Sequence, residues 1–168
     1  MRPRLVPFQL ASRVTASWVK HVGTALAVLA ALGSFACGGG KPGTPAPQSL
    51  SEALAQFMSA VKANDIRRLG ALWGSERGPA AAWMKSDDLN QRLTVIQKYL
   101  NHQRYRVVEG PLAVPGKDEM RTYRVELHRA SGCSVVLPID LVRAKAGSWL
   151  VLDVHLDVAG NPASPCRP

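Results

Sequence analysis

The sequence lacks the short motifs that mark the commonest catalytic and metal sites. It contains no Gly-x-Ser-x-Gly, no His-Glu-x-x-His and no Cys-x-x-Cys. Three consecutive glycines occur at 38–40, but they lack the preceding strand, the following helix and the Lys-Ser/Thr pair of a phosphate-binding loop. No motif therefore specifies a reaction, and we expect neither a cofactor nor a metal ion.

Outside the N-terminal segment the sequence carries only a small excess of positive charge. The chain has a formal charge of +9, from 21 basic and 12 acidic side chains. Four of the basic residues and none of the acidic ones lie in residues 1–36, so the remainder carries only +5. It has no long basic run and no recognisable nucleic-acid-binding module. We therefore expect no nucleic-acid partner.

The sequence has no apolar run long enough for an ordinary membrane-spanning helix. The run at residues 22–32 (VGTALAVLAAL) has instead the length of the apolar region of a secretory signal. Basic residues precede it, and Ser34 and Ala36 supply the small side chains that suit a signal peptidase cut before Cys37. Residues 1–36 are therefore predicted to be a signal peptide that exports the protein to the cell envelope.

The segment around Cys37 also resembles a bacterial lipoprotein signal, in which the cysteine after the cut is lipidated. That signal prefers leucine and a small residue where this chain has Ser34 and Phe35, so the match is partial. Residues 37–48 are rich in glycine and proline, which predicts a flexible tether between an anchor and a folded domain. We expect membrane attachment through a lipid on Cys37. A soluble periplasmic or secreted protein and an uncleaved signal anchor are the alternatives.

The chain contains only three cysteines. If Cys37 carries the lipid, Cys133 and Cys166 are left, and an exported compartment permits them to form a disulfide. Such a bridge would tie the C-terminal tail to the sheet and stabilise the fold by about 3–4 kcal/mol in the chain-entropy model. Two unpaired thiols are the alternative.

The first half of the mature chain has the periodicity of helices. Ser49 and Glu52 have the spacing of a capping box, and apolar residues then recur on one face to about residue 63. Asn64 or Asp65 caps a second short helix, a helical turn is expected at 80–85, and residue 86 begins a further helix. The expected inward residues are Leu50, Leu54, Phe57, Val61, Ile66, Leu69, Leu72, Trp73, Leu89, Leu93, Ile96 and Leu100.

From residue 105 the pattern changes to the alternation of β-strands. Strands are expected at 105–109, 119–129, 133–143 and 149–158, with Pro138 at an edge position or a bulge. Helices followed by hairpin-linked strands predict one α+β domain over 49–168, with helices packed on a curved antiparallel sheet. The expected inward residues are Tyr123, Val125, Leu127, Val135, Leu137, Ile139, Leu141, Leu150, Leu152, Val154, Leu156 and Val158.

This order of elements resembles the nuclear-transport-factor-2-like superfamily, and more narrowly its small bacterial lipoproteins. The resemblance covers about residues 49–158. It is carried by FMSAVKANDIRRL at 57–69, a helix, a polar break and a second helix, and by the tryptophan-led strand GSWLVLDV at 147–154. It implies a cone with a pocket between sheet and helices. The superfamily includes ketosteroid isomerase, scytalone dehydratase and many non-catalytic modules, so the resemblance assigns no residue a role.

The best chemical candidate lies in the last predicted strand. Alternation would place Asp153, His155 and Asp157 on one face. A carboxylate beside an imidazole supports proton transfer, and the three groups together could ligate a metal. The alternative is the polar, solvated face of a strand.

The leading hypothesis is a non-catalytic envelope protein that binds a small apolar ligand or a partner protein. Trp73 and Trp83 suit either the core or the lining of a pocket, and Tyr99 is a further candidate for the lining. The alternatives are a small enzyme that uses the histidine and carboxylates of the last strand in general acid–base chemistry, and a structural assembly module.

Overall fold

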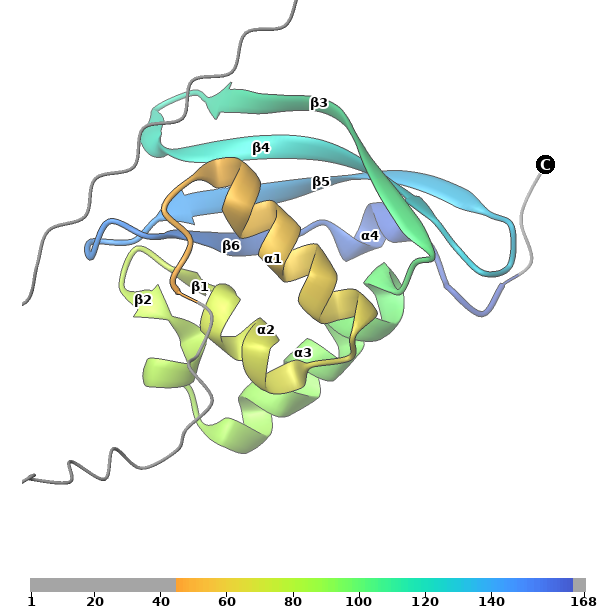
Figure 1. The fold of residues 1–168 in the computed structure, drawn as a ribbon, viewed down its shortest axis with the longest axis horizontal. Helices are drawn as coiled ribbons and strands as arrows, with labels where there is room; N and C mark the ends of the chain where they lie inside the picture. Colours follow the sequence, from red (N-terminus) through yellow and green to blue (C-terminus); the bar gives the residue numbers. More distant parts are fainter. Residues whose placement is uncertain (1–44, 165–168) are drawn as a thin grey trace, which may run out of the picture. The chain divides into compact units, whose positions relative to one another are not determined.

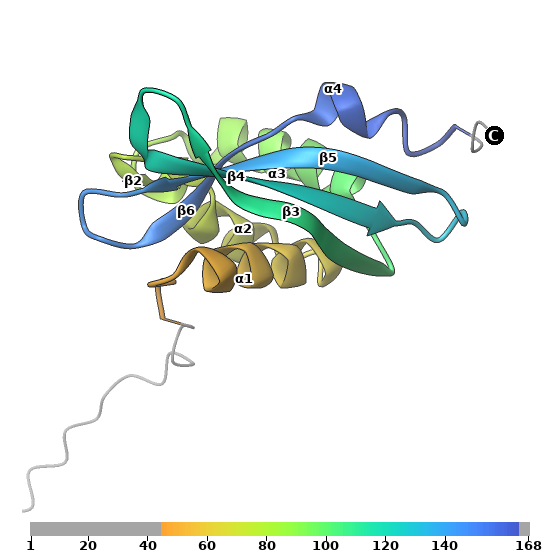
Figure 2. The same ribbon diagram turned by 90° about the horizontal axis from the view of Figure 1, so that it is seen from above.

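The computed structural model describes residues 45–164, in which helices pack on one face of a curved four-stranded antiparallel sheet (Figure 1; Figure 2). This confirms the predicted α+β class. The strands follow chain order across the sheet, β3-β4-β5-β6. The elements are α1 Leu50–Lys62, α2 Ile66–Leu72, β1 Gly74–Ser75, β2 Gly78–Pro79, the 3₁₀ helix η1 Ala80–Ala82, α3 Ser86–Leu100, β3 Arg104–Val114, β4 Lys117–His128, β5 Ser134–Arg143, β6 Trp149–Val154 and α4 Leu156–Ala159.

The predicted caps of the first two helices are present. Ser49 Oγ accepts a hydrogen bond from the Glu52 N–H at 3.2 Å, and Asp65 Oδ1 accepts one from the Arg68 N–H at 2.8 Å. The Glu52 carboxylate reaches back to the Gln48 N–H at 3.0 Å, so two otherwise unpaired donors are satisfied at this helix start. Local sequence is therefore sufficient to start both helices.

The main core lies between the helices and the inner face of the sheet. The predicted inward residues Phe57, Leu93, Val125, Leu137 and Ile139 are all fully buried. Each such side chain contributes about 1.5–3 kcal/mol by leaving water. The alternation predicted for the two central strands is thus confirmed. Side chains occupy the space between sheet and helices, and the opposite side of the sheet is called the outer face below.

The first strand is longer than predicted. We expected it to end at Gly110-Pro111, but β3 runs from Arg104 to Val114. Its pairing with β4 shifts register between Glu109 and Leu112, and Gly110 adopts φ 115°, which favours glycine. β3 is an edge strand, so Pro111 can interrupt the pairing without removing a bond to a second neighbour. The irregularity bends the strand instead of ending it.

The last strand is shorter than predicted. We expected a strand at 149–158, but β6 ends at Val154 and the chain turns into α4. His155 occupies the N-cap position of α4, and Val158, predicted to face inward, is 48% exposed. The sequence alternates through this segment as a strand would. A helix of four residues is too short to reveal itself by a 3.6-residue period.

A β-bulge in β6 also moves its side chains between faces. Val151 pairs with Leu141 and Asp153 pairs with Asp140, so Leu152 has no residue opposite it. Val151 is fully buried in the main core although the simple alternation placed it outside. The prediction that every second residue of this strand faces the core is therefore wrong.

A second, smaller apolar cluster lies on the outer face. Leu150, predicted to face the main core, packs there against Met120, Val142 and Ala144. Leu152 is partly buried against the same cluster. The last strand therefore divides its apolar residues between two clusters.

Pro138 lies in β5 between two neighbouring strands. It pairs with Arg124 of β4, and its carbonyl accepts a hydrogen bond from the His155 N–H at 3.3 Å, just beyond the end of β6. A strand residue points its nitrogen and its carbonyl toward the same neighbour. The missing N–H of Pro138 therefore faces the place where β6 has ended, which is locally the edge position that we predicted.

The last residues of the predicted tether are bound to the domain. Pro47 is buried, and its carbonyl accepts a hydrogen bond from the Trp149 N–H at 3.0 Å. The guanidinium of Arg68 donates to the Pro45 carbonyl at 3.4 Å. The predicted signal peptide and residues 37–44 lie outside the described residues. Within residues 45–164, no helix is both long and apolar enough to cross a membrane.

Candidate functional site

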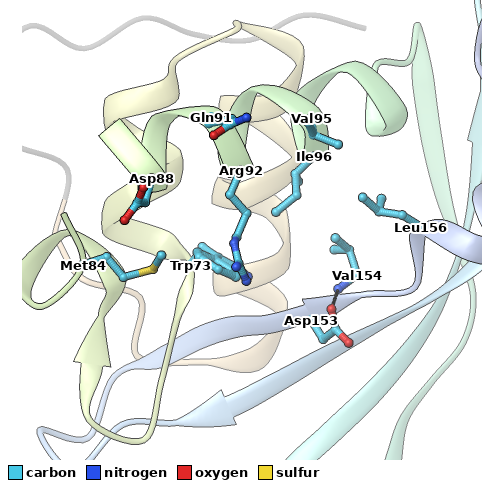
Figure 3. Close-up of a pocket in the computed structure, with 10 residues that line it drawn as sticks. All are labelled: Trp73, Met84, Asp88, Gln91, Arg92, Val95, Ile96, Asp153, Val154 and Leu156. Atoms are coloured by element: carbon cyan, nitrogen blue, oxygen red, sulfur yellow. Dashed lines mark hydrogen bonds between the residues drawn. The ribbon is translucent and has the colours of Figure 1, made fainter. Parts of the chain in front are cut away.

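A groove opens between α3 and the junction of β6 with α4 (Figure 3). It has a volume of about 590 Å³ and is open to solvent along one side. Its lining comes from five separate parts of the chain: Trp73, Met84, Asp88, Gln91, Arg92, Val95, Ile96, Asp153, Val154 and Leu156. The helices that end at Trp73 and contain Arg92 were predicted from the sequence. That they meet β6 and α4 at this place was not predicted.

Trp73 forms one wall of the groove and is held at both ends. Its backbone caps the C-terminus of α2 and forms a parallel bridge with Val151. Its indole Nε1 donates a hydrogen bond to the Leu152 carbonyl at 3.1 Å. Leu152 is the bulged residue on an edge strand, so the bulge supplies the acceptor that orients the ring. The residue is 9% exposed, and the fold therefore fixes its position before any ligand binds.

Arg92 extends from α3 toward Trp73, as Figure 3 shows. Its guanidinium carbon lies 5.7 Å from the centre of the Trp73 ring, a cation–π distance. Within the described part of the chain, Arg92 forms no ion pair. A fixed positive charge therefore faces the groove beside an aromatic ring.

The rest of the groove joins apolar side chains to two acids. Val95 is 44% exposed and stands beside the buried Ile96, while Leu156 of α4 lies across from them. Asp153 Oδ1 accepts a hydrogen bond from the Val154 N–H at 2.8 Å. Asp88 lies in the first turn of α3, where the helix dipole favours a negative charge.

The three residues proposed as a catalytic or metal-binding trio do not belong to one strand. Only Asp153 belongs to β6, while His155 occupies the N-cap position of α4 and Asp157 lies exposed in its first turn. The partner of His155 is Asp140, whose Oδ2 lies 3.0 Å from Nε2. Strand alternation does not extend past Val154, so the argument that one strand places all three residues on a common face fails, although Asp153 and Asp157 lie near enough for their charges to act on His155.

Asp140 holds His155 on the outer face. Asp140 Oδ1 accepts a hydrogen bond from the Thr122 hydroxyl at 2.5 Å, which completes a chain of three groups. The hydrogen bond to Asp140 raises the pKa of His155, partial burial opposes it, and the charges of Asp140, Asp153 and Asp157 add to the rise. Neither His155 nor Asp140 lines the groove. This pair therefore attaches the start of α4 to β5 and leaves the groove without an imidazole.

The other two aromatic candidates lie elsewhere. Trp83 is 41% exposed, donates from Nε1 to the Gly78 carbonyl at 3.2 Å, and stacks with Arg77 at 5.0 Å. It lines neither the core nor the groove. Tyr99 is partly buried against the main core, and it does not reach the groove. Of the three aromatic residues predicted to line a pocket, Trp73 alone is among the residues of this groove.

Sequence reasoning missed Arg92 and Val95. Asp88, Arg92 and Val95 recur at helical spacing on the solvent side of α3, so they share one face. Val95, an apolar residue on an otherwise polar helix face, is the one signal that could have indicated this surface. Met84 and Leu156 carry no comparable signal, because each lies in a segment too short for periodicity.

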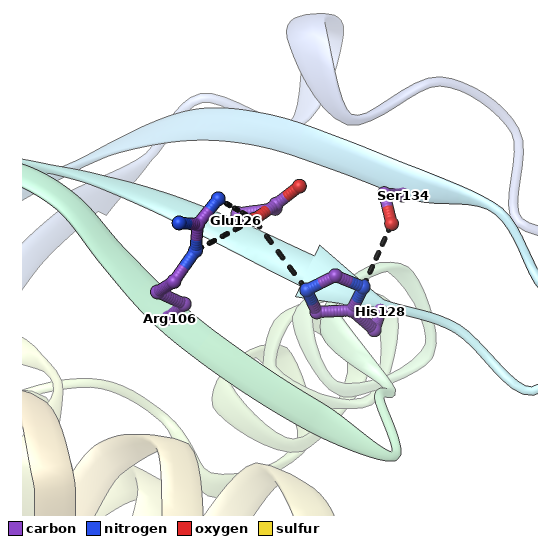
Figure 4. Close-up of polar contacts among 4 residues, drawn as sticks. All are labelled: Arg106, Glu126, His128 and Ser134. Atoms are coloured by element: carbon purple, nitrogen blue, oxygen red, sulfur yellow. Dashed lines mark hydrogen bonds and ion pairs between the residues drawn. The ribbon is translucent and has the colours of Figure 1, made fainter.

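A second polar cluster lies on the outer face (Figure 4). Two guanidinium nitrogens of Arg106 donate to Glu126 Oε2, at 3.0 and 2.7 Å. His128 Nε2 lies 3.4 Å from the same oxygen, and its Nδ1 lies 2.8 Å from Ser134 Oγ. The hydrogen bond from Arg106 lowers the pKa of Glu126. These groups satisfy one another, so we interpret the cluster as cross-strand stabilisation.

His102 is 6% exposed at the junction of α3 and β3. Its Nδ1 lies 2.8 Å from the Leu100 carbonyl, which can only accept, so Nδ1 carries the proton. Its ring meets Tyr105 edge-on, with centroids 5.6 Å apart. Burial lowers the pKa of His102, the hydrogen bond to Leu100 opposes this, and Lys62 lowers it further.

The predicted cysteine chemistry lies mostly outside the described residues. This is so for Cys37 and Cys166, and both the lipid and the Cys133–Cys166 disulfide stay predictions. Among residues 45–164, no group of three or more His, Cys, Asp or Glu side chains is arranged to hold a metal ion.

No family model matches the sequence, and no curated protein matches it. The fold is similar to a solved crystal structure from Campylobacter jejuni that is described as a "Putative NTF2-like transpeptidase". The two share 14% identity with a TM-score of 0.43, over 62% of this chain and 99% of the other.

Proposed function

We propose that this protein is an exported, lipid-anchored envelope protein of the NTF2-like lipoprotein type, and that it binds a small apolar ligand in the groove beside Trp73 without catalysing a reaction. One observation carries the proposal. Trp73 is held in place by the Leu152 carbonyl at the wall of a groove of about 590 Å³ whose other side exposes Val95. A rigid aromatic wall and an exposed apolar side chain form a surface on which binding of an apolar group is favourable, because it removes apolar area from water.

The chemistry of the lining favours binding over catalysis. General acid–base catalysis commonly uses a group whose pKa lies near the working pH. The groove's own titratable residues are Asp88, Arg92 and Asp153, and the nearest histidine in sequence is hydrogen-bonded to Asp140 outside the groove. A small enzyme that uses His155 with Asp153 or Asp157 would need these groups together in one cavity.

The envelope location rests on the sequence of residues 1–48. A signal-like segment, Cys37 and a Gly/Pro-rich tether follow one another in the order that a lipid-anchored protein requires. Mass spectrometry of the native protein extracted from membranes would report the acyl mass on Cys37 and any ligand that copurifies. The Cys37→Ser variant should lose that mass and leave the membrane fraction. An unmodified Cys37 thiol in the membrane-extracted protein would remove the lipid from the proposal.

Ligand binding can be measured through Trp73 itself. The predicted mature chain contains Trp73, Trp83 and Trp149, so a Trp83→Phe, Trp149→Phe background leaves Trp73 as the reporter. Titration with decanol should produce a saturable change in its fluorescence. Val95→Glu should abolish that change, because it places a charge on the apolar wall.

Val108→Glu is the matched control for Val95→Glu. Val108 is 46% exposed on β3, against 44% for Val95, and it lies outside the groove. We expect it to leave the titration unchanged. If no apolar compound alters Trp73 fluorescence, or if both variants lose the response equally, the groove is not the binding site.

A further inference from the structure

We propose that the groove prefers amphiphiles with a single carboxylate headgroup, medium-chain or long-chain fatty acids by class, and that Arg92 binds this carboxylate. The inference rests on the proposed function, because it names the ligand class of the same groove. Three observations support it. Arg92 has no ion pair among the described residues, the two acids of the lining do not pair with it, and it is the one cation among the residues that line the groove.

Arg92 lies at a cation–π distance from Trp73 and forms no ion pair within the described residues. The guanidinium carbon is 5.7 Å from the ring centre, and no carboxylate of residues 45–164 forms an ion pair with it. The five N–H groups of a guanidinium lie in its own plane and can bind a carboxylate in a two-pronged fashion. None of those of Arg92 is used in an ion pair within residues 45–164, so they are left for a ligand carboxylate.

The two acids of the lining do not neutralise Arg92. Asp153 Oδ1 already accepts the Val154 N–H at 2.8 Å, and in Figure 3 its carboxylate points away from Trp73. Asp88 lies one helical turn before Arg92, in the first turn of α3, and no ion pair between the two is formed. The positive charge beside Trp73 is thus left for a ligand, and the acids make a cationic amphiphile the natural competitor to test.

The remaining surface fits an apolar chain. Val95, Ile96 and Leu156 extend the lining beyond Arg92 along α3 and across to α4. Arg92 is the one cation among the residues that line the groove. A single guanidinium matches the charge of one carboxylate, whereas a phosphate monoester would keep uncompensated charge beside Asp88 and Asp153. A fatty acid would place its carboxylate at Arg92 and its acyl chain along Val95, Ile96 and Leu156.

The test compares three decyl compounds in the Trp83→Phe, Trp149→Phe variant, in which Trp73 is the fluorescent reporter. Decanoate, decanol and decyltrimethylammonium share a chain and differ in headgroup charge, and each is titrated below its micelle concentration at pH 8. We expect decanoate to bind at least tenfold more tightly than decanol, and decyltrimethylammonium to bind more weakly than decanol. Arg92→Gln should remove the preference for decanoate and leave the affinity for decanol within about twofold, since a guanidinium–carboxylate contact is lost and the apolar contacts stay.

Arg104→Gln, at the far edge of the sheet, is the control for net charge and should keep the full preference. Equal binding of decanoate and decanol, tighter binding of the cation, or a preference that survives Arg92→Gln would each overturn the inference while leaving an apolar groove. Absence of any response to all three compounds would overturn the proposed function as well.

Discussion

The groove beside Trp73 and the polar cluster on the outer face each contain an arginine, and the two arginines differ in their partners. Arg106 donates twice to Glu126, which also contacts His128. Arg92 has an aromatic ring beneath it and no ion pair in the described chain. A guanidinium that is bound to a carboxylate stabilises the fold, whereas one without an ion pair is free to bind a ligand. Arg77 also lies over a tryptophan without an ion pair in residues 45–164, so what distinguishes Arg92 is its place in the lining of the groove, where we propose the ligand binds.

The largest expected effect distinguishes the groove tryptophan from the surface tryptophan. Trp73→Ala should lower the free energy of unfolding by about 3–5 kcal/mol, because it removes a nearly buried ring and leaves a cavity. Trp83→Ala should cost far less, since that ring is 41% exposed. Urea denaturation followed by circular dichroism measures both. Equal losses would mean that Trp73 is no more structural than Trp83.

A smaller effect tests whether the bulge orients the groove. Trp73→Phe keeps an aromatic ring for Arg92 but removes the donor to the Leu152 carbonyl. We expect a loss of about 1 kcal/mol in unfolding free energy, the usual worth of one hydrogen bond. Decanoate affinity, measured by calorimetry because the reporter is gone, should fall as well. A variant that loses neither stability nor affinity would show that the indole N–H does not position the wall.

The two partly or fully buried histidines should respond to pH in opposite directions. The pKa of His102 is lowered from 6.5, so its contribution to stability is present above pH 6.5 and is lost as the pH falls through its folded-state pKa. The pKa of His155 is raised from 6.5, so its contribution is complete below pH 6.5 and is lost as the pH rises through its folded-state pKa.

Denaturation midpoints between pH 5 and pH 8 separate these two contributions. His102→Gln should remove the loss of stability on the acid side, and His155→Gln should remove the loss on the alkaline side. Ligand affinity at fixed pH should not change in His155→Gln, because His155 does not line the groove. A pH profile that is the same in both variants and in the parent would show that neither contact contributes.

The smallest effect concerns the paired arginine. Arg106→Gln should lower stability slightly in dilute buffer and by less in high salt, because salt screens an exposed ion pair. Arg92→Gln should show no such salt dependence, having no ion pair to lose. In ligand titrations the order should reverse, with Arg106→Gln unchanged and Arg92→Gln impaired. Matching behaviour of the two variants in both assays would contradict the contrast between the regions.

Sequence reasoning succeeded where one segment contains its own information. Ser49 and Asp65 cap helices through neighbours three residues away, and the alternation of Val125 and Leu127 survives in β4. It failed in β6, where the bulge at Leu152 and the turn into α4 follow from pairing with β5. The partner of His155 was missed for the same reason, since Asp140 reaches it only across that register.

The sequence by itself determined the starts of α1 and α2, the buried faces of the long elements and the α+β class, because caps and periodicity act over one or two turns. Only the tertiary structure decided that Trp73, Arg92 and Leu156 share a groove. They come from the end of α2, the solvent face of α3 and the first residue of α4, which meet because a bulge on an edge strand presents the Leu152 carbonyl to Trp73. That contact depends on the register of β6 against β5. The register is set by the packing of side chains from distant parts of the chain, so no local segment encodes it.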